Sequence, residues 1–107
     1  MKQTMSEKTE IRRDKATATW NSGRGKHSKG DALLGIFTVD YKESAKSFTL
    51  NTRVWAKVQK DAISNSNSVP ALKIILGTEI KERLWIVQED IIHDYVRLLE
   101  EEAERNG

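Results

Sequence analysis

KGDALLGIFTVDYKESAKSF, residues 29–48, is the stretch that decides the fold of this chain. Its apolar run is short and is interrupted by Gly35, which predicts two strands that meet at this glycine rather than a helix. Residues two apart on a strand point to the same face, so Asp40 and Lys42 project together. The neighbouring strand adds Asp31. Two carboxylates and an amine gathered there can hold a hard divalent cation beside a phosphate, and a solvated strand pair is the alternative.

The segments around this stretch predict the rest of an α/β fold. Short alternating or β-branched runs indicate strands, and longer runs with apolar residues at helical spacing indicate helices. The predicted elements are a helix at 6–15 with Ser6 as its cap, a strand at 16–20, the strand pair above, a helix at about 52–64 capped by Asn51, strands at 69–76 and 84–87, and a last helix at 89–105. In the helix at 52–64, apolar residues recur at helical spacing and are expected to face the sheet: Val54, Trp55, Val58 and Ala62. Together they predict a mixed β-sheet flanked by helices, in the order α-β-β-β-α-β-β-α.

A glycine-rich basic loop, residues 21–30, precedes Asp31. Glycines let a backbone approach a ligand closely, and lysine and arginine among them suit phosphate oxygens. The loop does not have the spacing of a Walker loop, so we expect no nucleotide cofactor. Residues 1–30 carry a net charge of +5 and residues 89–107 one of −5. This asymmetry suggests a polyanionic partner at the basic end, with an ordinary soluble surface as the alternative.

Length and composition narrow the class of protein. A chain of 107 residues suits one domain, in which we expect residues 1–5 to be flexible and residues 100–107 to form an acidic helical tail. The chain has no cysteine, which excludes disulfides, thiolate zinc sites and cysteine nucleophiles. No apolar run approaches the roughly 18 residues of a membrane span, and the charged first ten residues do not suggest a secretory signal. We therefore expect a cytoplasmic protein without a membrane partner.

Five short motifs in a fixed order resemble those of the PD-(D/E)XK nucleases. Within that superfamily the chain is most similar to the small Holliday junction resolvases of archaeal type and their phage-borne relatives, over roughly residues 7–88. The resemblance implies a restriction-endonuclease-like core and a phage-encoded enzyme that acts in the host cytoplasm. The motifs are Ser22-Gly23, Lys29-Gly30-Asp31, Val39-Asp40-Tyr41-Lys42, Lys46-Ser47-Phe48 and Pro70-Ala71-Leu72-Lys73-Ile74.

The resemblance also implies roles for individual residues. Asp31 and Asp40 would bind the catalytic Mg²⁺, for which Mn²⁺ could substitute, and Lys42 would be the catalytic lysine. The family's N-terminal helix contributes a glutamate, which maps to Glu7, with Glu10 as the alternative. Many relatives carry a glutamate where this chain has Asp40, so a bound metal would sit closer to the strand.

The implied substrate is a four-way DNA junction, and the implied assembly is a homodimer that makes two symmetric nicks. The apolar stripe of the last helix either pairs with the second subunit or completes the core. The alternatives are a nuclease for other branched or single-stranded DNA, and a non-catalytic nucleic-acid-binding module in which Asp40 and Lys42 form an ion pair. The predicted contacts to DNA phosphates are Ser22, Arg24, Lys26, Lys29, Lys46 and Ser47.

Overall fold

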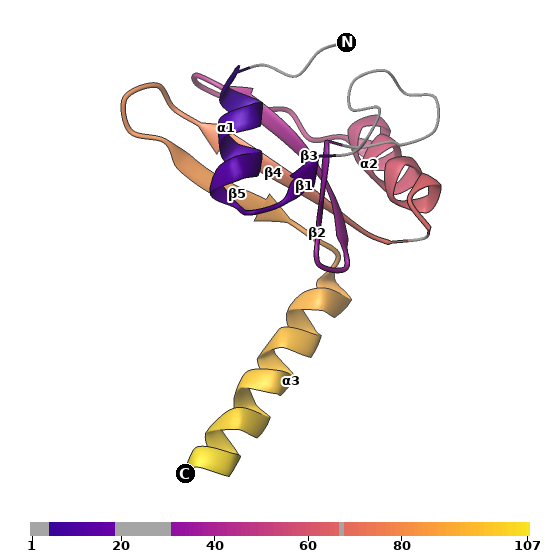
Figure 1. The fold of residues 1–107 in the computed structure, drawn as a ribbon, viewed down its shortest axis with the longest axis vertical. Coiled ribbons are helices and arrows are strands. Elements are labelled where there is room, and N and C mark those ends of the chain that lie inside the picture. Colours follow the sequence, from indigo (N-terminus) through magenta and orange to yellow (C-terminus); the bar gives the residue numbers. More distant parts are fainter. Residues whose placement is uncertain (1–4, 19–30, 67) are drawn as a thin grey trace.

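The structure, a computed structural model, describes residues 5–18, 31–66 and 68–107, with side chains from residue 8 onward (Figure 1). The predicted order of elements is confirmed: an α/β fold with a five-stranded mixed sheet and three helices. In the part of the chain that is described, no helix is both long and apolar enough to cross a membrane. The elements are α1 (Met5–Arg13), β1 (Thr17–Ala18), β2 (Ala32–Leu34), β3 (Phe37–Ser44), α2 (Thr52–Ser64), β4 (Val69–Leu76), β5 (Glu82–Ile86) and α3 (Glu89–Asn106).

The strands lie side by side in chain order, from β1 to β5. The first three are antiparallel neighbours, β3 and β4 are parallel, and β5 is antiparallel to β4. The predicted turn at Gly35 is confirmed, because Leu34 pairs with Phe37 across a two-residue turn. Gly35 has a φ of 57°, a conformation that a residue without Cβ adopts at no steric cost.

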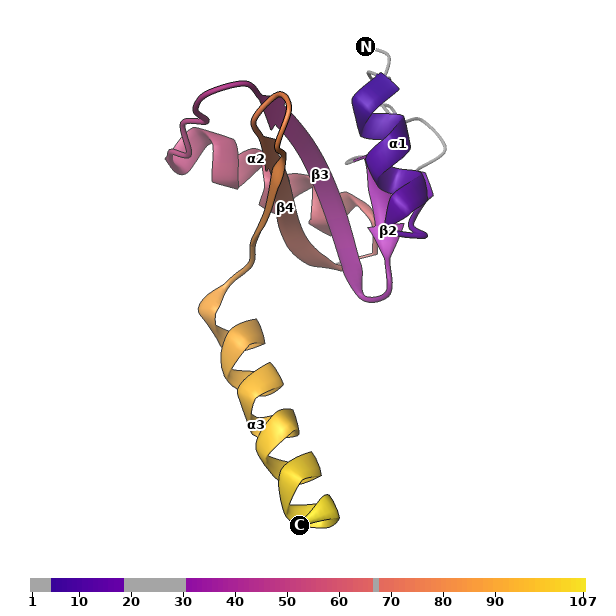
Figure 2. The same cartoon turned by 90° about the vertical axis from the view of Figure 1, so that its left-hand side faces the viewer.

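Helices α1 and α2 cover opposite faces of the sheet (Figures 1 and 2). On the α1 face, Ile11 packs with Val39 and Tyr41 of β3. On the α2 face, Val58 packs with Leu72 and other residues of β4. Two successive residues of a strand point to opposite faces, so alternate residues of β4 enter the two cores. The apolar residues of β3 enter only the core on the α1 face.

Helix α2 begins as the sequence predicts. The side chain of Asn51 caps it, because the Oδ1 atom accepts a hydrogen bond of 2.9 Å from the N–H of Val54. Val58 and Ala62, which the helical spacing assigned to the core, are buried. Asp61 is buried with them, so a carboxylate lies within the apolar face of this helix.

Several element boundaries differ from the prediction by one or two residues, and the position of α3 bears on the two alternatives left open for its apolar stripe. Helix α1 begins at Met5, one residue before the predicted cap, and β5 begins at Glu82, two residues before the predicted strand. Helix α3 projects away from the sheet in both views, and every residue in it except Ile91 is exposed (Figures 1 and 2). Its apolar stripe therefore does not complete the core formed by the described residues.

Candidate active site

Asp40 is the centre of the candidate site. It lies in the middle of β3 on the α2 face, and only 3% of its surface is exposed. No N–H or O–H group of the described residues donates a hydrogen bond to either of its carboxylate oxygens. The Nζ atom of Lys57 lies 3.9 Å from Oδ2. A buried carboxylate without donors is costly unless a proton or a cation neutralises it, which makes Asp40 a candidate ligand.

Asp31 lies beside Asp40, as the sequence predicted. The backbone N–H of Tyr41 donates a 2.7 Å hydrogen bond to Asp31 Oδ2, and the N–H of Asp31 donates to the carbonyl of Val39 at 3.0 Å. These bonds hold the Asp31 carboxylate against β3, where its charge acts on Asp40. The β2–β3 hairpin thus brings two aspartates of the same motif set together.

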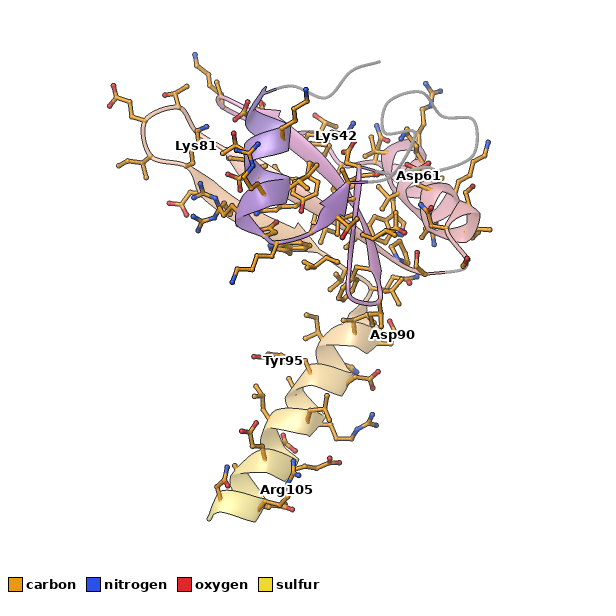
Figure 3. The ribbon with its side chains drawn as sticks, in the orientation of Figure 1. Lys42, Asp61, Lys81, Asp90, Tyr95 and Arg105 are labelled. Atoms are coloured by element: carbon orange, nitrogen blue, oxygen red, sulfur yellow. The ribbon has the colours of Figure 1, made fainter. Side chains whose placement is uncertain are left out.

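Helix α2 contributes two residues that the sequence did not predict for the metal site. Asp61 lies on α2, with only 3% of its surface exposed (Figure 3). Lys57 donates a 2.8 Å hydrogen bond to its Oδ2 atom. Lys57 itself is 64% exposed, so its ammonium covers the carboxylates from the solvent side. The sequence does contain a signal that Asp61 is buried, because Asp61 lies between Val58 and Ala62 on an otherwise apolar face of the helix. We call Asp31, Asp40, Asp61 and Lys57 the Asp40 site.

The electrostatics of the Asp40 site favour a bound positive charge. Burial raises the pKa of Asp40 to about 8, and the neighbouring Asp61 contributes to the rise, because a protonated Asp40 can donate to the Asp61 carboxylate and two anions repel. Lys57 opposes this rise, and Asp31 adds to it. A proton satisfies the cluster, and a divalent cation would satisfy it in the same way.

The donor set fits Mg²⁺. No three histidine, cysteine, aspartate or glutamate side chains form a ready-made metal site within the described residues. Mg²⁺, however, keeps several of its waters and is commonly bound through only one or two carboxylates together with substrate phosphates. The orphaned oxygens of Asp40, with Asp31 beside them, supply such a pair.

The other predicted site residues have different outcomes. Lys42 is half-buried on the same strand face as Asp40. It forms no ion pair with any described residue, so the Asp40–Lys42 pair of the non-catalytic alternative is not formed. Lys46 is exposed beyond the end of β3, as is Ser47, whose carbonyl accepts a hydrogen bond from the Ser44 hydroxyl. The residues that lie outside the described part are the Glu7 side chain, Ser22, Arg24, Lys26 and Lys29.

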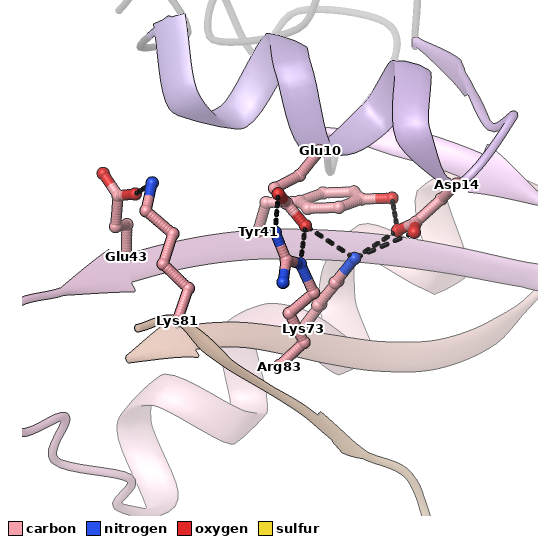
Figure 4. Close-up of polar contacts among 7 residues, drawn as sticks. All are labelled: Glu10, Asp14, Tyr41, Glu43, Lys73, Lys81 and Arg83. Atoms are coloured by element: carbon pink, nitrogen blue, oxygen red, sulfur yellow. Dashed lines mark hydrogen bonds and ion pairs between the residues drawn. The ribbon is translucent and has the colours of Figure 1, made fainter. Parts of the chain in front are cut away.

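Glu10 is directed away from the Asp40 site, to the opposite face of the sheet (Figure 4). Lys73 Nζ lies 2.9 Å from Glu10 Oε1, and Arg83 donates to both carboxylate oxygens at 2.9 and 3.2 Å. Asp14 accepts from Lys73 at 2.8 Å and from the Tyr41 hydroxyl at 2.9 Å. The hydrogen bond from Arg83 lowers the pKa of Glu10 to about 2 despite its burial, with further lowering by Lys73. These five residues, the Lys73 cluster, attach α1 to the sheet and occupy both oxygens of Glu10.

Compared with protein-family models, curated proteins and solved structures, the chain shows no match. What the site can do follows from its own residues. It combines buried carboxylates from β3 and α2, a backbone-anchored aspartate and two amines at or near the surface. Such a set can bind a divalent cation and a phosphate together.

Substitutions around Asp40 are expected to move its pKa in opposite directions. Asp61→Asn removes the neighbouring anion and should lower the pKa of Asp40 from about 8 toward its ordinary range. Lys57→Met removes the cation and should raise it further. A carboxyl-detected NMR titration of the metal-free protein measures both shifts, with the exposed Glu43 as an internal reference. Shifts of the same sign in the two variants would contradict this account of the site.

Proposed function

We propose that this chain is a metal-dependent endonuclease that hydrolyses phosphodiester bonds at the Asp40 site and resolves four-way DNA junctions. The observation that carries the proposal is the buried Asp40 carboxylate, which has no hydrogen-bond donor among the described residues and lies beside Asp31. Structural carboxylates are normally paired when buried, as Glu10 and Asp14 are in this chain. Perturbed and unsatisfied groups gather at functional sites.

The residues have separable roles in this reaction. Asp31 and Asp40 would hold the cation, and the backbone N–H of Tyr41 fixes the orientation of Asp31. A Mg²⁺ ion held there would supply Lewis acidity and a more acidic water. Lys42, two residues along the strand, would orient the attacking water and stabilise the negative charge that develops on the phosphate. Lys57 would keep the Asp61 carboxylate from competing for the cation.

The architecture supports the same assignment. The order α1, β1, β2, β3, α2, β4, with β3 and β4 parallel and the acidic residues on β3 and just before β2, agrees with the restriction-endonuclease-like core implied by the sequence motifs. A four-way junction is the substrate that those motifs imply. The predicted basic loop would contact its phosphates, with Lys46 and Ser47 placed beyond the end of β3.

Cleavage of a synthetic four-way junction tests the proposal directly. We expect paired nicks with Mg²⁺ or Mn²⁺, no cleavage with EDTA, and little cleavage of a linear duplex of the same sequence. Lys42→Ala should reduce the rate by about a hundredfold or more, as expected for a group that stabilises charge in the transition state. The matched control is Lys60→Ala, an exposed lysine on α2.

The assay also separates the alternatives. Cleavage of flaps or single strands in preference to junctions would keep the nuclease and change its substrate. Binding without cleavage at any Mg²⁺ concentration would support the non-catalytic module. The non-catalytic alternative predicts an ion pair between Asp40 and Lys42. The cation next to Asp40 is, however, Lys57.

A further inference from the structure

Helix α3 has an apolar face that nothing in the described part of its own chain covers. It spans 18 residues, follows closely after the end of β5 and extends away from the sheet (Figures 1 and 2). Its large apolar side chains, apart from the half-buried Ile91, are 46–59% exposed. Helices in proteins owe most of their stability to the packing of such a face against a partner. We therefore expect a packing partner to cover the apolar face of α3.

One apolar seam runs along the whole helix. Ile92, Val96, Leu99 and Ala103 follow one another at intervals of four, three and four residues, the spacing of the a and d positions of a coiled coil. A second stripe, Ile91–Tyr95–Leu98, has the same spacing. Its next position, however, is Glu102, so it is interrupted by a charge after two turns. The first stripe is the one suited to continuous helix–helix packing.

We propose that the occupant is α3 of a second copy of this chain, packed antiparallel. In this register Ile92 packs against the partner's Ala103, and Val96 packs against the partner's Leu99. A two-fold axis makes each contact occur twice, so a single seam is self-complementary. The proposal goes beyond the nuclease assignment and does not depend on it.

Charge selects the antiparallel orientation. Helix α3 carries seven acidic residues against two arginines, and four of the acids lie at residues 100–104. Parallel packing would place the two acidic segments side by side, whereas antiparallel packing moves them to opposite ends and opposes the two helix dipoles. It also brings His93 next to the partner's Glu100. The sheets of the two copies then lie at opposite ends of the helix pair.

The oligomeric state of the full chain tests the seam. A seam of two heptads predicts a dimer that forms with rising concentration and dissociates on dilution. Leu99→Glu places a charge in the seam and should weaken association by about tenfold or more. Leu98→Glu, on a neighbouring exposed position, is the matched control and should leave association unchanged. Sedimentation equilibrium measures both. A wild-type chain that stays monomeric, or a larger effect of Leu98→Glu, overturns the proposal.

Engineered cysteines test the orientation, because the natural chain has none. Antiparallel packing places position 92 against position 103 of the partner, whereas identical positions lie about 16 Å apart along the axis. A disulfide requires Cα atoms within about 7 Å. An oxidised mixture of Ile92→Cys and Ala103→Cys chains should therefore give only the mixed cross-linked dimer. Cross-links within either variant alone, or none in the mixture, would overturn the antiparallel arrangement.

Discussion

Asp40→Asn is expected to abolish junction cleavage and, in the same protein, to raise stability at pH 8. The loss of activity follows from the proposed role of Asp40 as a ligand, because an amide does not supply the negative charge that holds a divalent cation. We expect a decrease in the cleavage rate of about a thousandfold or more, since metal-ion catalysis contributes several kcal/mol to transition-state stabilisation. Binding to the junction should be retained, because the substitution removes a negative charge near the phosphates.

The gain in stability follows from the raised pKa of Asp40. In the unfolded chain this carboxyl titrates near its ordinary value of 3.8, and in the folded protein it titrates at about 8. Between these two values the folded state holds a proton that the unfolded state has lost. The free energy of unfolding of the metal-free wild type therefore falls as the pH rises from about 4 to about 8. Asparagine does not ionise, and its amide can still donate to Asp61.

Chemical denaturation in EDTA at pH 5 and pH 8 measures this effect. Asp40→Asn should stabilise the protein on the order of 3 kcal/mol at pH 8 and clearly less at pH 5. Glu43→Gln is the control, because Glu43 is on the same strand but is solvent-accessible. Cleavage by Asp40→Asn at the wild-type rate would exclude this site as the catalytic centre. An equal gain in stability at both pH values would mean that the buried charge is not its cause.

Much of the fold was predictable because local patterns determine it. The glycine between two apolar runs predicted the β2–β3 hairpin, and that hairpin alone brings Asp31 to β3. Asn51 and the spacing of Val58 and Ala62 predicted α2 and the face that it buries. Each of these inferences needs only neighbouring residues and the periods of helix and strand.

The missed residues depend on contacts between distant segments. Lys57 and Asp61 reach Asp40 only because α2 packs on the sheet as the connection between β3 and β4. The place of Asp61 in the apolar stripe indicates that it is buried, but nothing within α2 specifies its contact with Asp40. Glu10 was the alternative metal ligand because it lies on the first helix. In the structure it faces Lys73 and Arg83, which are 63 and 73 residues away in the sequence. Such pairings are decided by strand register and helix rotation, which the sequence pattern leaves open.

Lys73→Met is expected to cause a large loss of stability, because it removes the central cation of the Lys73 cluster. The Lys73 side chain is 2% exposed, and its ammonium lies 2.9 Å from Glu10 and 2.8 Å from Asp14. It also lies 5.7 Å from the centre of the Tyr41 ring. Removing the cation leaves the largely buried Asp14 with the Tyr41 hydroxyl as its remaining side-chain partner among the described residues. Breaking one side of a buried ion pair typically costs about 3–5 kcal/mol.

Lys81→Met is the matched comparison. Lys81, which directly precedes β5, also forms an ion pair, at 3.2 Å from Glu43 of β3, but both side chains are about one-third exposed. Its loss should cost about 1 kcal/mol or less, because water replaces the partner. Thermal unfolding should therefore show a decrease of about 15 °C or more for Lys73→Met and only a few degrees for Lys81→Met. Equal decreases would mean that burial does not govern these pairs.

A triple variant separates the loss of the lysine from the exposure of its partners. The loss of stability in Lys73→Met is expected to come from carboxylates that are left buried without a cation. Adding Glu10→Gln and Asp14→Asn should then restore part of that stability, because a neutral cluster has no unpaired buried charge. Arg83 then loses its anion, but it reaches solvent and is rehydrated at little cost. We expect the triple variant to unfold at a temperature between those of Lys73→Met and the wild type. A triple variant less stable than Lys73→Met would show instead that the two carboxylates stabilise α1 through contacts other than Lys73.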